Sequence, residues 1–358
     1  MTCGLIYISI FNANFCEHFH KKMKTPQLTI KDIARSLNVS ISTVSRALKD
    51  HPDISHETKE LVRNFAEKFN YRPNVLALSL RRQRSYSIGL IIPAIVHHYF
   101  SSVISGIEEL AHKEGYNLII CQSNENQYRE MINLQTLIDH RVDGILVSLS
   151  KTTQTYEHFS EALNNGMPMV FFDRVCEQLE ADKVITDDFE GGYIATEYLI
   201  NKGCRNIIHL AAPQNLLIGR DRRNGYCEAL RKAGIEVRED RILKCDTREE
   251  VQTLRQHILN QVPNLDGIFA VNDSTAIAVI QVLQQNGLRV PEDVSVIGFG
   301  DGPNASIIKP ELTTVIQKGY EMGRESVKLL LQRLNNPAAD INYQTKVFKP
   351  TLKIRQSA

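Results

Sequence analysis

The sequence has no apolar run long enough to cross a membrane and no cysteine pattern typical of a disulfide or zinc protein. A membrane helix needs about 18 consecutive apolar residues, and no stretch of this 358-residue chain reaches that length. Its seven cysteines are scattered, odd in number and never in CxxC spacing. We therefore expect a protein of a reducing cytoplasm that has no disulfide framework, no metal site and no cofactor.

Motifs of the common nucleotide-dependent and hydrolytic enzymes are also missing. The chain has no GxGxxG at the start of its first predicted strand–helix unit, no GxxxxGK[ST], no HExxH and no GxSxG. Paired carboxylates could still form a hydrolytic site, so a sugar hydrolase or a dehydrogenase stays an alternative. We predict that the protein is not an enzyme.

The first 24 residues lack the order of a cleavable signal peptide. Such a peptide places positive charge before its apolar stretch, whereas Lys21 and Lys22 follow the apolar residues here. We expect residues 1–24 to be disordered or to precede the true start, and translation could begin at Met1 or at Met23.

The small net charge of +1 conceals a basic segment attached to an acidic remainder. Residues 25–85 hold eleven Lys and Arg against six Asp and Glu, a charge of +5, and the residues before them add +2, which leaves −6 for the rest. A basic segment suits binding to a polyanion. Because the chain is longer than one ordinary domain, we expect a small basic domain followed by a larger one that is itself two-lobed.

The basic segment has the pattern of three short helices. Apolar residues between Ile30 and Leu37 follow a helical spacing, and Thr29 with Asp32 forms a capping box at the start. Asn38 can then adopt the left-handed conformation of a tight turn. Ser40 can cap a second helix, and a third helix that begins near residue 55 supplies enough apolar side chains to close a small core.

The second of these helices places polar side chains on its outer face. Val44, Ala47 and Leu48 turn inward. Serine hydroxyls and arginine can bind base edges or phosphates, and an aliphatic side chain can contact a thymine methyl. The side chains that could reach a major groove are Ile41, Ser42, Ser45, Arg46 and Lys49. On spacing alone, a three-helix module that binds a protein, or that only folds, stays an alternative.

Residues 28–74 resemble the DNA-binding head of the lactose-repressor (LacI) family. LTIKDIARSLNVSISTVSRAL and HPDISHETKELVRNFAEKFNYRPN contain that family's T-x-x-D-[IV]-A start, its V-S-x-x-T-V-S-R recognition helix and its N-Y-x-P-N exit. The resemblance implies that Ile41 and Ser42 read bases, although an apolar residue such as Ile41 is unusual there. The DNA contacts that we predict are Thr29, Ile41, Ser42, Thr43, Ser45, Arg46, Lys49, Asn74, Leu80 and Arg81.

A short apolar segment, NVLALSL, follows Pro73 and precedes Arg81 and Arg82. A helix of this length is marginal in water by itself, and it could be a linker helix that packs on the larger domain. The resemblance implies instead a hinge helix that forms on DNA, in which Leu80 wedges into a minor-groove step and Arg81 lies near phosphates. The predicted parts are a helix-turn-helix domain at 25–72, a hinge helix and linker at 73–85, and an effector-binding and dimerisation domain at 86–358.

Beyond residue 85, apolar strands alternate with amphipathic helices in two runs. The predicted strands are SIGLIIP, NLIICQS, VDGILVSL and MVFFD, then KVITDD, NIIHLAAP, RILKCD, GIFAVND and VSVIGFGD. Such strands indicate parallel sheets covered on both faces. We expect one lobe of about 86–185 and 317–345 and another of about 186–316 and 346–358. Ligands of these folds bind beyond the carboxyl ends of strands, here between the lobes.

The strand ends carry aromatic, acidic, amide and guanidinium groups, which suit a polyol. Each group alone could be an ordinary surface or helix-capping residue. Together the motifs FFDR, R-x-x-G-Y, A-x-N-D and G-[FY]-x-D, followed by P-x-L-T-T-V, resemble the effector pocket of the LacI family, whose body is similar to periplasmic sugar-binding proteins. Gly300 stands where many members carry an acid, and HHYF stands where N-P-F/Y-F is common. The effector contacts that we predict are His97, Tyr99, Phe100, Asp173, Arg222, Asn272 and Asp301.

The fold class expected is thus a small all-α helix-turn-helix head joined to an α/β, two-lobed, periplasmic-binding-protein-like effector domain. The resemblance implies a cytoplasmic transcription regulator, with repressor favoured over activator, whose operator affinity is controlled by a sugar or sugar derivative. Effector binding would reorient the lobes and shift the hinge helices between order and disorder. The chain shows no leucine-heptad tail, so we expect a homodimer on a near-palindromic operator. A sugar-binding protein without a DNA role is the alternative.

Overall fold

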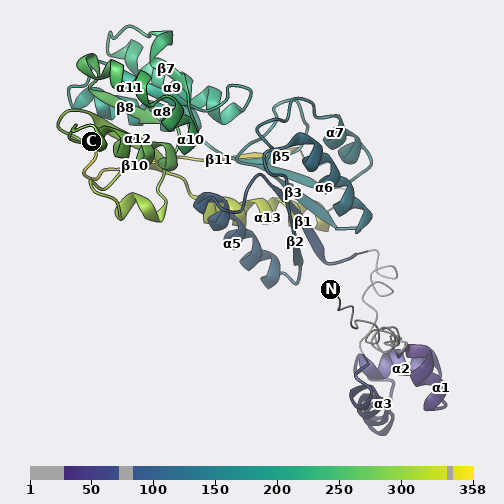
Figure 1. The fold of residues 1–358 in the computed structure, drawn as a ribbon. Coiled ribbons are helices and arrows are strands. Elements are labelled where there is room, and N and C mark those ends of the chain that lie inside the picture. Colours follow the sequence, from purple (N-terminus) through teal and green to yellow (C-terminus); the bar gives the residue numbers. More distant parts are fainter. Residues whose placement is uncertain (1–27, 72–83, 337–341) are drawn as a thin grey trace, which may run out of the picture. The chain divides into compact units, whose positions relative to one another are not determined.

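The computed structural model describes residues 28–71, 84–336 and 342–358. The chain divides into two compact units, residues 1–83 and residues 84–358 (Figure 1). The predicted contacts Asn74, Leu80 and Arg81, with nearly all of the predicted hinge, lie outside the described residues. Within the described part of the chain, no helix is long and apolar enough to cross a membrane.

The first unit is a three-helix bundle, as the apolar spacing predicted. Its helices are α1 (Ile30–Ser36), α2 (Ile41–Leu48) and α3 (His56–Lys68). The capping box of Thr29 and Asp32 is present, Asn38 has φ 52°, and the Ser40 side chain accepts a hydrogen bond from the Thr43 amide at 3.0 Å. The core between the helices consists of Ile33, Ala34, Val44, Ala47, Val62 and Ala66.

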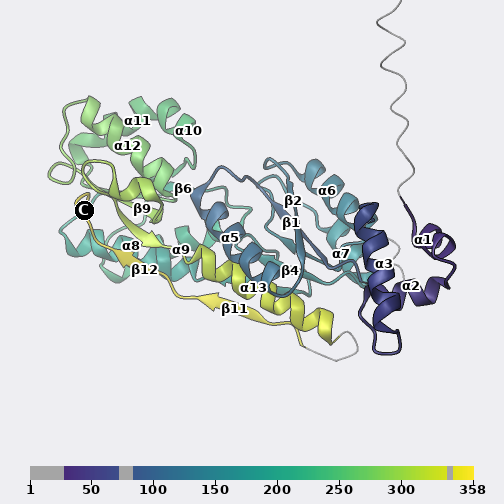
Figure 2. The same ribbon diagram turned by 90° about the horizontal axis from the view of Figure 1, so that it is seen from below.

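The second unit contains two sheets, each with helices on both faces (Figures 1 and 2). The first sheet is all parallel, in the order β11-β5-β4-β3-β1-β2. Its strands are β1 (Ser87–Ile92), β2 (Asn117–Gln122), β3 (Gly144–Val147), β4 (Met169–Phe172), β5 (Asp182–Thr186) and β11 (Thr345–Phe348). The helices of this lobe are α5 (His98–Lys113), α6 (Gln127–Asp139), α7 (Glu157–Asn164) and α13 (Gly319–Asn335).

The second sheet has the order β12-β10-β9-β8-β6-β7, and only its edge strand β12 is antiparallel to its neighbour. Its strands are β6 (Ile207–Ala211), β7 (Ile242–Lys244), β8 (Gly267–Ala270), β9 (Ser295–Gly300), β10 (Thr313–Ile316) and β12 (Thr351–Lys353). Its helices are α8 (Asp188–Asn201), α9 (Leu217–Lys232), α10 (Arg248–Thr253), α11 (Arg255–Gln261) and α12 (Asp273–Gln285), with short 3-10 turns η1 (Glu239–Arg241), η2 (Val262–Asn264) and η3 (Pro303–Ser306).

The chain crosses between the lobes three times: from β5 to α8, from β10 to α13, and from β11 to β12. The last crossing follows residue 348, three residues beyond the expected position, because β11 pairs with β5 in the first sheet through Phe348. The strands β11 and β12 are short and largely exposed, so they carry no apolar run that the sequence reading could detect.

Candidate DNA-binding and effector sites

The outer face of α2 has the composition that the sequence predicted. Ile41 is 46% exposed, and Ser42, Arg46 and Lys49 are exposed, whereas Val44 and Ala47 on the opposite face are buried. Among the described residues, the one ion pair of Arg46 is a long contact of 4.0 Å with the exposed Asp53. A contact of that kind contributes little, so it does not fix the Arg46 guanidinium.

The hydroxyls at the start of α2 are close to one another. The Ser40 Oγ lies 2.7 Å from the Ser42 Oγ and 2.8 Å from the Thr43 Oγ1. The Thr29 hydroxyl, by contrast, donates to the Asp32 carboxylate at 2.6 Å and thereby holds the start of α1. The structure thus gives Thr29 a capping role in addition to its predicted DNA contact.

Arg222 is the most constrained of the predicted effector residues. It is 4% exposed, its Nε donates to the Asp188 carboxylate at 2.8 Å, its Nη2 pairs with the same oxygen at 2.7 Å, and its Nη1 donates to the Val271 carbonyl at 2.7 Å. The guanidinium also lies over the Phe299 ring at 3.6 Å from the centroid, a cation–π geometry. The planar group is therefore held on its edges and on one face.

Asp188 and Phe299 are functional candidates that sequence reasoning missed. Asp188 is the last residue of the predicted strand KVITDD, and acids at strand ends were selected as candidates in other strands. Its neighbour Asp187 caps α8 by accepting from the Glu190 amide at 3.0 Å, which leaves Asp188 to face Arg222. Phe299 lies inside β9 and looks like a core residue in sequence, because nothing local reveals that a guanidinium covers its ring.

Close packing of α8 against α9 fixes the position of Arg222. A Cβ on Gly192 of α8 would lie 2.3 Å from the Arg222 carbonyl oxygen, and a Cβ on Gly225 of α9 would lie 2.1 Å from the Phe189 carbonyl oxygen. Side chains at either glycine would push the helices apart and displace Arg222 from Asp188. The R-x-x-G-Y motif thus requires glycine at position 225 because the two helices pack too closely for a side chain there.

The first lobe contributes Tyr99 and Asp173 to the site that contains Arg222. Asp173 follows β4, has φ 58° and is 5% exposed. Burial raises the pKa of Asp173, and the positive charges of Arg174 and Arg222 oppose that shift. Tyr99 is half-buried and donates its hydroxyl to the Met322 sulfur at 2.9 Å, while burial and then the charge of Asp173 raise its pKa. These side chains therefore belong to one electrostatic cluster with Arg222.

Three other predicted effector residues have protein partners of their own. Phe100 is 3% exposed and belongs to the core of the first lobe. Asn272 caps α12 by accepting from the Thr275 amide, and its Nδ2 donates to the Asp246 carbonyl at 2.8 Å. Asp301 accepts a hydrogen bond from Arg355 at 2.5 Å. Their ligand contacts stay predictions, and the structure also gives each a structural role.

Gly300, where many family members carry an acid, has a backbone reason to be glycine here. Its φ of 141° disfavours other residues, and a Cβ would lie 3.3 Å from the Asp273 carboxylate. That carboxylate accepts from the Thr314 hydroxyl at 2.5 Å and from the Gly302 amide at 2.8 Å. Asp273 therefore holds the loop after β9 in place.

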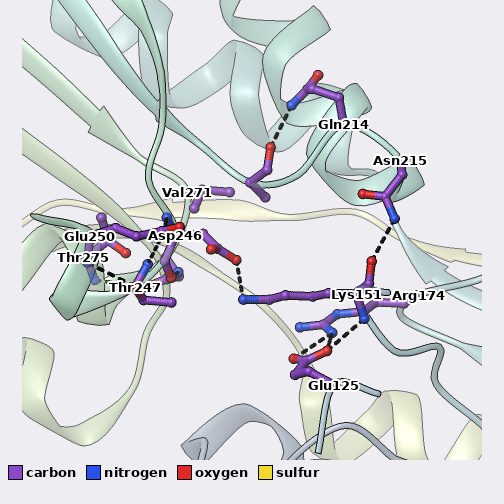
Figure 3. A network of polar contacts seen from close by, with 12 residues as sticks. Glu125, Lys151, Arg174, Gln214, Asn215, Asp246, Thr247, Glu250, Val271 and Thr275 are labelled. Carbon is purple, nitrogen blue, oxygen red and sulfur yellow. Dashed lines mark hydrogen bonds and ion pairs between the residues drawn. The ribbon is translucent and has the colours of Figure 1, made fainter. Parts of the chain in front are cut away.

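A bridge of charged and polar groups joins the two lobes beside this cluster (Figure 3). The Lys151 ammonium, after β3, lies 2.5 Å from the Asp246 carboxylate, after β7. The Lys151 carbonyl accepts from Asn215 at 2.7 Å, and its amide donates to Glu125 at 2.8 Å. Glu125 in turn pairs with Arg174 at 2.8 Å. His97 lies near these groups. More than a third of the residue is exposed, and the partial burial of its ring, followed by the charge of Arg174, lowers its pKa.

Several buried polar atoms near the carboxyl ends of the strands have no hydrogen-bond partner among the described residues. They include the hydroxyls of Ser148 and Thr186, directly after β3 and at the end of β5, the Thr275 hydroxyl, and the Arg174 Nε. Buried polar groups are normally satisfied by protein, water or ligand. Ser148, Thr186 and Arg174 belong to the first lobe, and Thr275 to the second.

A helix-turn-helix head with an exposed polar recognition face, followed by a two-lobed α/β body whose polar groups gather between the lobes, defines a DNA-binding regulator controlled by a small molecule. Residues 29–74 match the family described as bacterial regulatory proteins, lacI family. Residues 85–350 match the periplasmic binding proteins and sugar binding domain of the LacI family. The chain belongs to the LacI family of bacterial transcription regulators, and the sequence-based prediction of family and fold is confirmed.

Individual relatives agree with this assignment. The chain is 34% identical over 330 residues to the ribose operon repressor of Haemophilus influenzae, a match that covers 92% of this chain and 98% of that protein. It is 32% identical to the HTH-type transcriptional repressor PurR of Vibrio campbellii, with the same coverages. Among solved structures, the complex of the transcriptional regulator CelR with cellobiose is 26% identical, with a TM-score of 0.71 over 92% of this chain and 100% of that one. These relatives are transcription regulators, in keeping with a regulatory rather than an enzymatic role.

Proposed function

We propose that this protein is a homodimeric repressor whose affinity for a near-palindromic operator is controlled by an uncharged sugar or sugar derivative bound between its lobes. The observation that carries the proposal is the buried cluster of Arg222, Asp188, Asp173 and Tyr99, which draws on both lobes. We propose further that the protein acts in the cytoplasm, where its operator lies, and has no catalytic activity.

The charges of the site favour a neutral ligand over a phosphorylated one. Arg222 is already paired with Asp188, and the other cations nearby, Arg174 and Lys151, pair with Glu125 and Asp246. Asp188 is 5% exposed, and this burial raises its pKa to about 7. An anionic ligand would meet these buried acids without an unpaired cation, whereas sugar hydroxyls can donate to carboxylates and accept from Arg and Ser.

A thermal-shift screen tests the ligand class. The panel contains ribose, cellobiose and other neutral mono- and disaccharides, each beside its phosphorylated form where one exists. A ligand that binds only the native state raises the melting temperature, and a neutral sugar at 100 times its Kd should stabilise by about 2.7 kcal/mol. A response to phosphorylated forms alone, or to no sugar at all, would refute the proposed class.

For the DNA side, we propose that Ile41, Ser42, Ser45, Arg46 and Lys49 contact the operator from α2, with Thr29 and Thr43 near the backbone. The hinge residues Asn74, Leu80 and Arg81 are proposed contacts from sequence alone. Effector contacts are proposed for His97, Tyr99, Phe100, Asp173, Arg222, Asn272 and Asp301.

Replacing Arg46 by methionine is expected to weaken operator binding about 5- to 150-fold, because a bidentate contact to a base is worth about 1–3 kcal/mol. Binding to random DNA should fall much less. Arg63→Met is the matched control, since it removes the same charge from α3, where Arg63 pairs with Asp50 at 3.0 Å. Fluorescence anisotropy at fixed salt measures both affinities. Equal losses in the two variants would remove Arg46 from sequence readout.

The proposed dimer has a candidate surface in the first lobe. The strand β2 is at the edge of its sheet, and Ile120 is 41% exposed there. On the neighbouring helix α6, Tyr128, Met131 and Ile132 are 70%, 42% and 48% exposed. A sheet edge with exposed apolar side chains is a surface that proteins usually cover, and a second copy of the chain is the occupant that a symmetric operator requires.

A further inference from the structure

A polar cavity lies in the second lobe, at the amino-terminal edge of its sheet. Arg205, Asn206 and Ile207 at the start of β6 line it, as does Arg241 directly before β7. Because β6 and β7 are parallel, their starts share one edge of the sheet. Their carboxyl ends lead instead to Gln214 and Asp246 beside the other lobe (Figure 3). The cavity is therefore separate from the effector site.

The cavity contains a buried arginine without a counter-ion. Arg241 is 6% exposed, and its Nη1 is buried with no hydrogen-bond partner among residues 28–71, 84–336 and 342–358. No ion pair of 4.0 Å or less joins it to a carboxylate in those ranges; Asp240 is near enough to be affected by its charge but pairs with Arg238 at 2.6 Å. A buried charge costs several kcal/mol unless it is paired. An anion bound beside Arg241 would offset that cost.

Two further arginines surround the cavity. Arg205 is exposed, and its Nη1 donates to the Ile200 and Cys204 carbonyls at 2.9 and 2.8 Å. In the part of the chain that the structure describes, no carboxylate pairs with its guanidinium. Arg238 is also exposed. The pair with Asp240 offsets the charge of Arg238, and the lining holds one acid, Glu236. Arg241 and Arg205, which no ion pair joins to a carboxylate among the described residues, leave the cavity wall with an excess of positive charge.

The size of the cavity limits the ligand. Its volume is about 30 Å³, roughly twice what one water molecule requires. That space admits a carboxylate or the oxygens of a phosphate group but no sugar ring. Arginine guanidinium groups match the geometry of both oxyanions. From the unpaired Arg241, the flanking arginines and the volume, we propose that this cavity binds a small oxyanion, either free phosphate or the phosphate or carboxylate group of a small metabolite.

Melting temperatures of the full-length protein test the proposal with inorganic phosphate, glycerol 3-phosphate, acetate and, at equal ionic strength, chloride. Phosphate at ten times its Kd should stabilise by about 1.4 kcal/mol, a rise of about 3–5 °C for a body of this size. A response to glycerol 3-phosphate that exceeds the response to phosphate would assign the site to a phosphorylated metabolite. A response no larger than that of chloride with every oxyanion would overturn the proposal.

Arginine variants test whether the oxyanion-induced rise in melting temperature comes from this cavity. Arg241→Met should abolish the oxyanion shift, and without oxyanion it should melt no lower than the unmodified protein, because an apolar side chain replaces an unpaired buried charge. Arg238→Met, at an exposed position, should weaken oxyanion binding several-fold. This second variant tests the location of the site if Arg241→Met does not fold. The control is Arg231→Met, an exposed arginine at the end of α9 paired with Glu228. An oxyanion shift that survives Arg238→Met as fully as Arg231→Met would refute the site.

Discussion

Replacing Arg222 by glutamine is expected to reduce effector affinity at least ~30-fold, because truncating one partner of a buried charge pair costs about 2–5 kcal/mol. Arg222 bridges Asp188, the Val271 carbonyl and the face of Phe299, so its loss removes a hydrogen-bond donor and also frees the groups that shape the pocket. Isothermal titration with the sugar that gives the largest thermal shift measures the loss. Operator affinity without that sugar should stay close to that of the unmodified protein.

Two further variants separate binding from stability in the Arg222 experiment. Removing Arg222 leaves Asp188 buried without a partner, which costs about 3–5 kcal/mol in other proteins, so Arg222→Gln should also melt earlier. Adding Asp188→Asn removes the stranded acid and should restore much of the stability without restoring the affinity. Arg223→Gln, on the same helix and paired with Glu239 at 2.6 Å, is the matched control. Unchanged sugar binding in Arg222→Gln would exclude this cluster as the effector site.

The second large effect is a loss of folding stability at low pH that His209 causes. His209, in β6, is fully buried, lies between the rings of Phe269 and Tyr226 at 4.7 and 5.3 Å, and bonds through Nδ1 to the Phe269 carbonyl at 3.0 Å. Burial lowers the pKa of His209 to about 4. In the unfolded chain its pKa is about 6.5, so between these values the unfolded state binds the extra proton and stability falls as the pH falls. From pH 7.5 to 4.5 the loss from this group is about 2–3 kcal/mol.

The comparison with His209→Asn isolates this effect from the other titrating groups. The asparagine amide can keep the bond to the Phe269 carbonyl but does not titrate. At pH 7.5 the variant should be the less stable protein, because it leaves a space between the two rings. Its disadvantage should shrink by about 2–3 kcal/mol at pH 4.5. Urea denaturation of both proteins at the two pH values measures the difference. A difference that does not change with pH would mean that His209 stays accessible to protons.

The buried carboxyls of Asp173 and Asp188 have the opposite effect on stability as the pH falls. Burial raises the pKa of Asp173 and of Asp188. Between the ordinary value near 4 and the raised value, the folded state holds the extra proton, so these groups add stability as the pH falls through that window. The overall acid profile is therefore a balance, and only the difference between the unmodified protein and the His209 variant reports on the histidine.

The sequence was most informative where one local pattern has one physical meaning. The capping box of Thr29 and Asp32, the left-handed Asn38 and the cap at Ser40 are short-range features, and all three are present. The apolar runs that became the central strands of both sheets were equally clear, because a strand buried on both faces needs apolar residues throughout. The exposed edge strands β11 and β12 gave no such signal.

The candidate effector site shows where sequence reasoning ends. The sequence-based prediction selected Arg222, Asp173 and Tyr99 as strand-end or motif residues, and the structure brings these together. The prediction did not include Asp188, which differs from Asp187 only in the direction that its side chain takes at the start of α8. The sequence also selected Asp301 as a ligand contact, which stays a prediction. The structure adds that Arg355, 54 residues away, donates a hydrogen bond to that carboxylate.

By itself, then, the sequence determined the helix-turn-helix head, the two runs of alternating strands and helices, and through its motifs the family. These depend on periodicity, capping and local composition, all of which act within a few turns of chain. Only the tertiary structure decided that Asp188 and Phe299 enclose Arg222, that Lys151 reaches Asp246 across the lobes, and that the Arg241 Nη1 is buried with no hydrogen-bond partner in the described ranges. Those features arise from side chains that crossings of the chain bring together, and burial then sets what each charge costs.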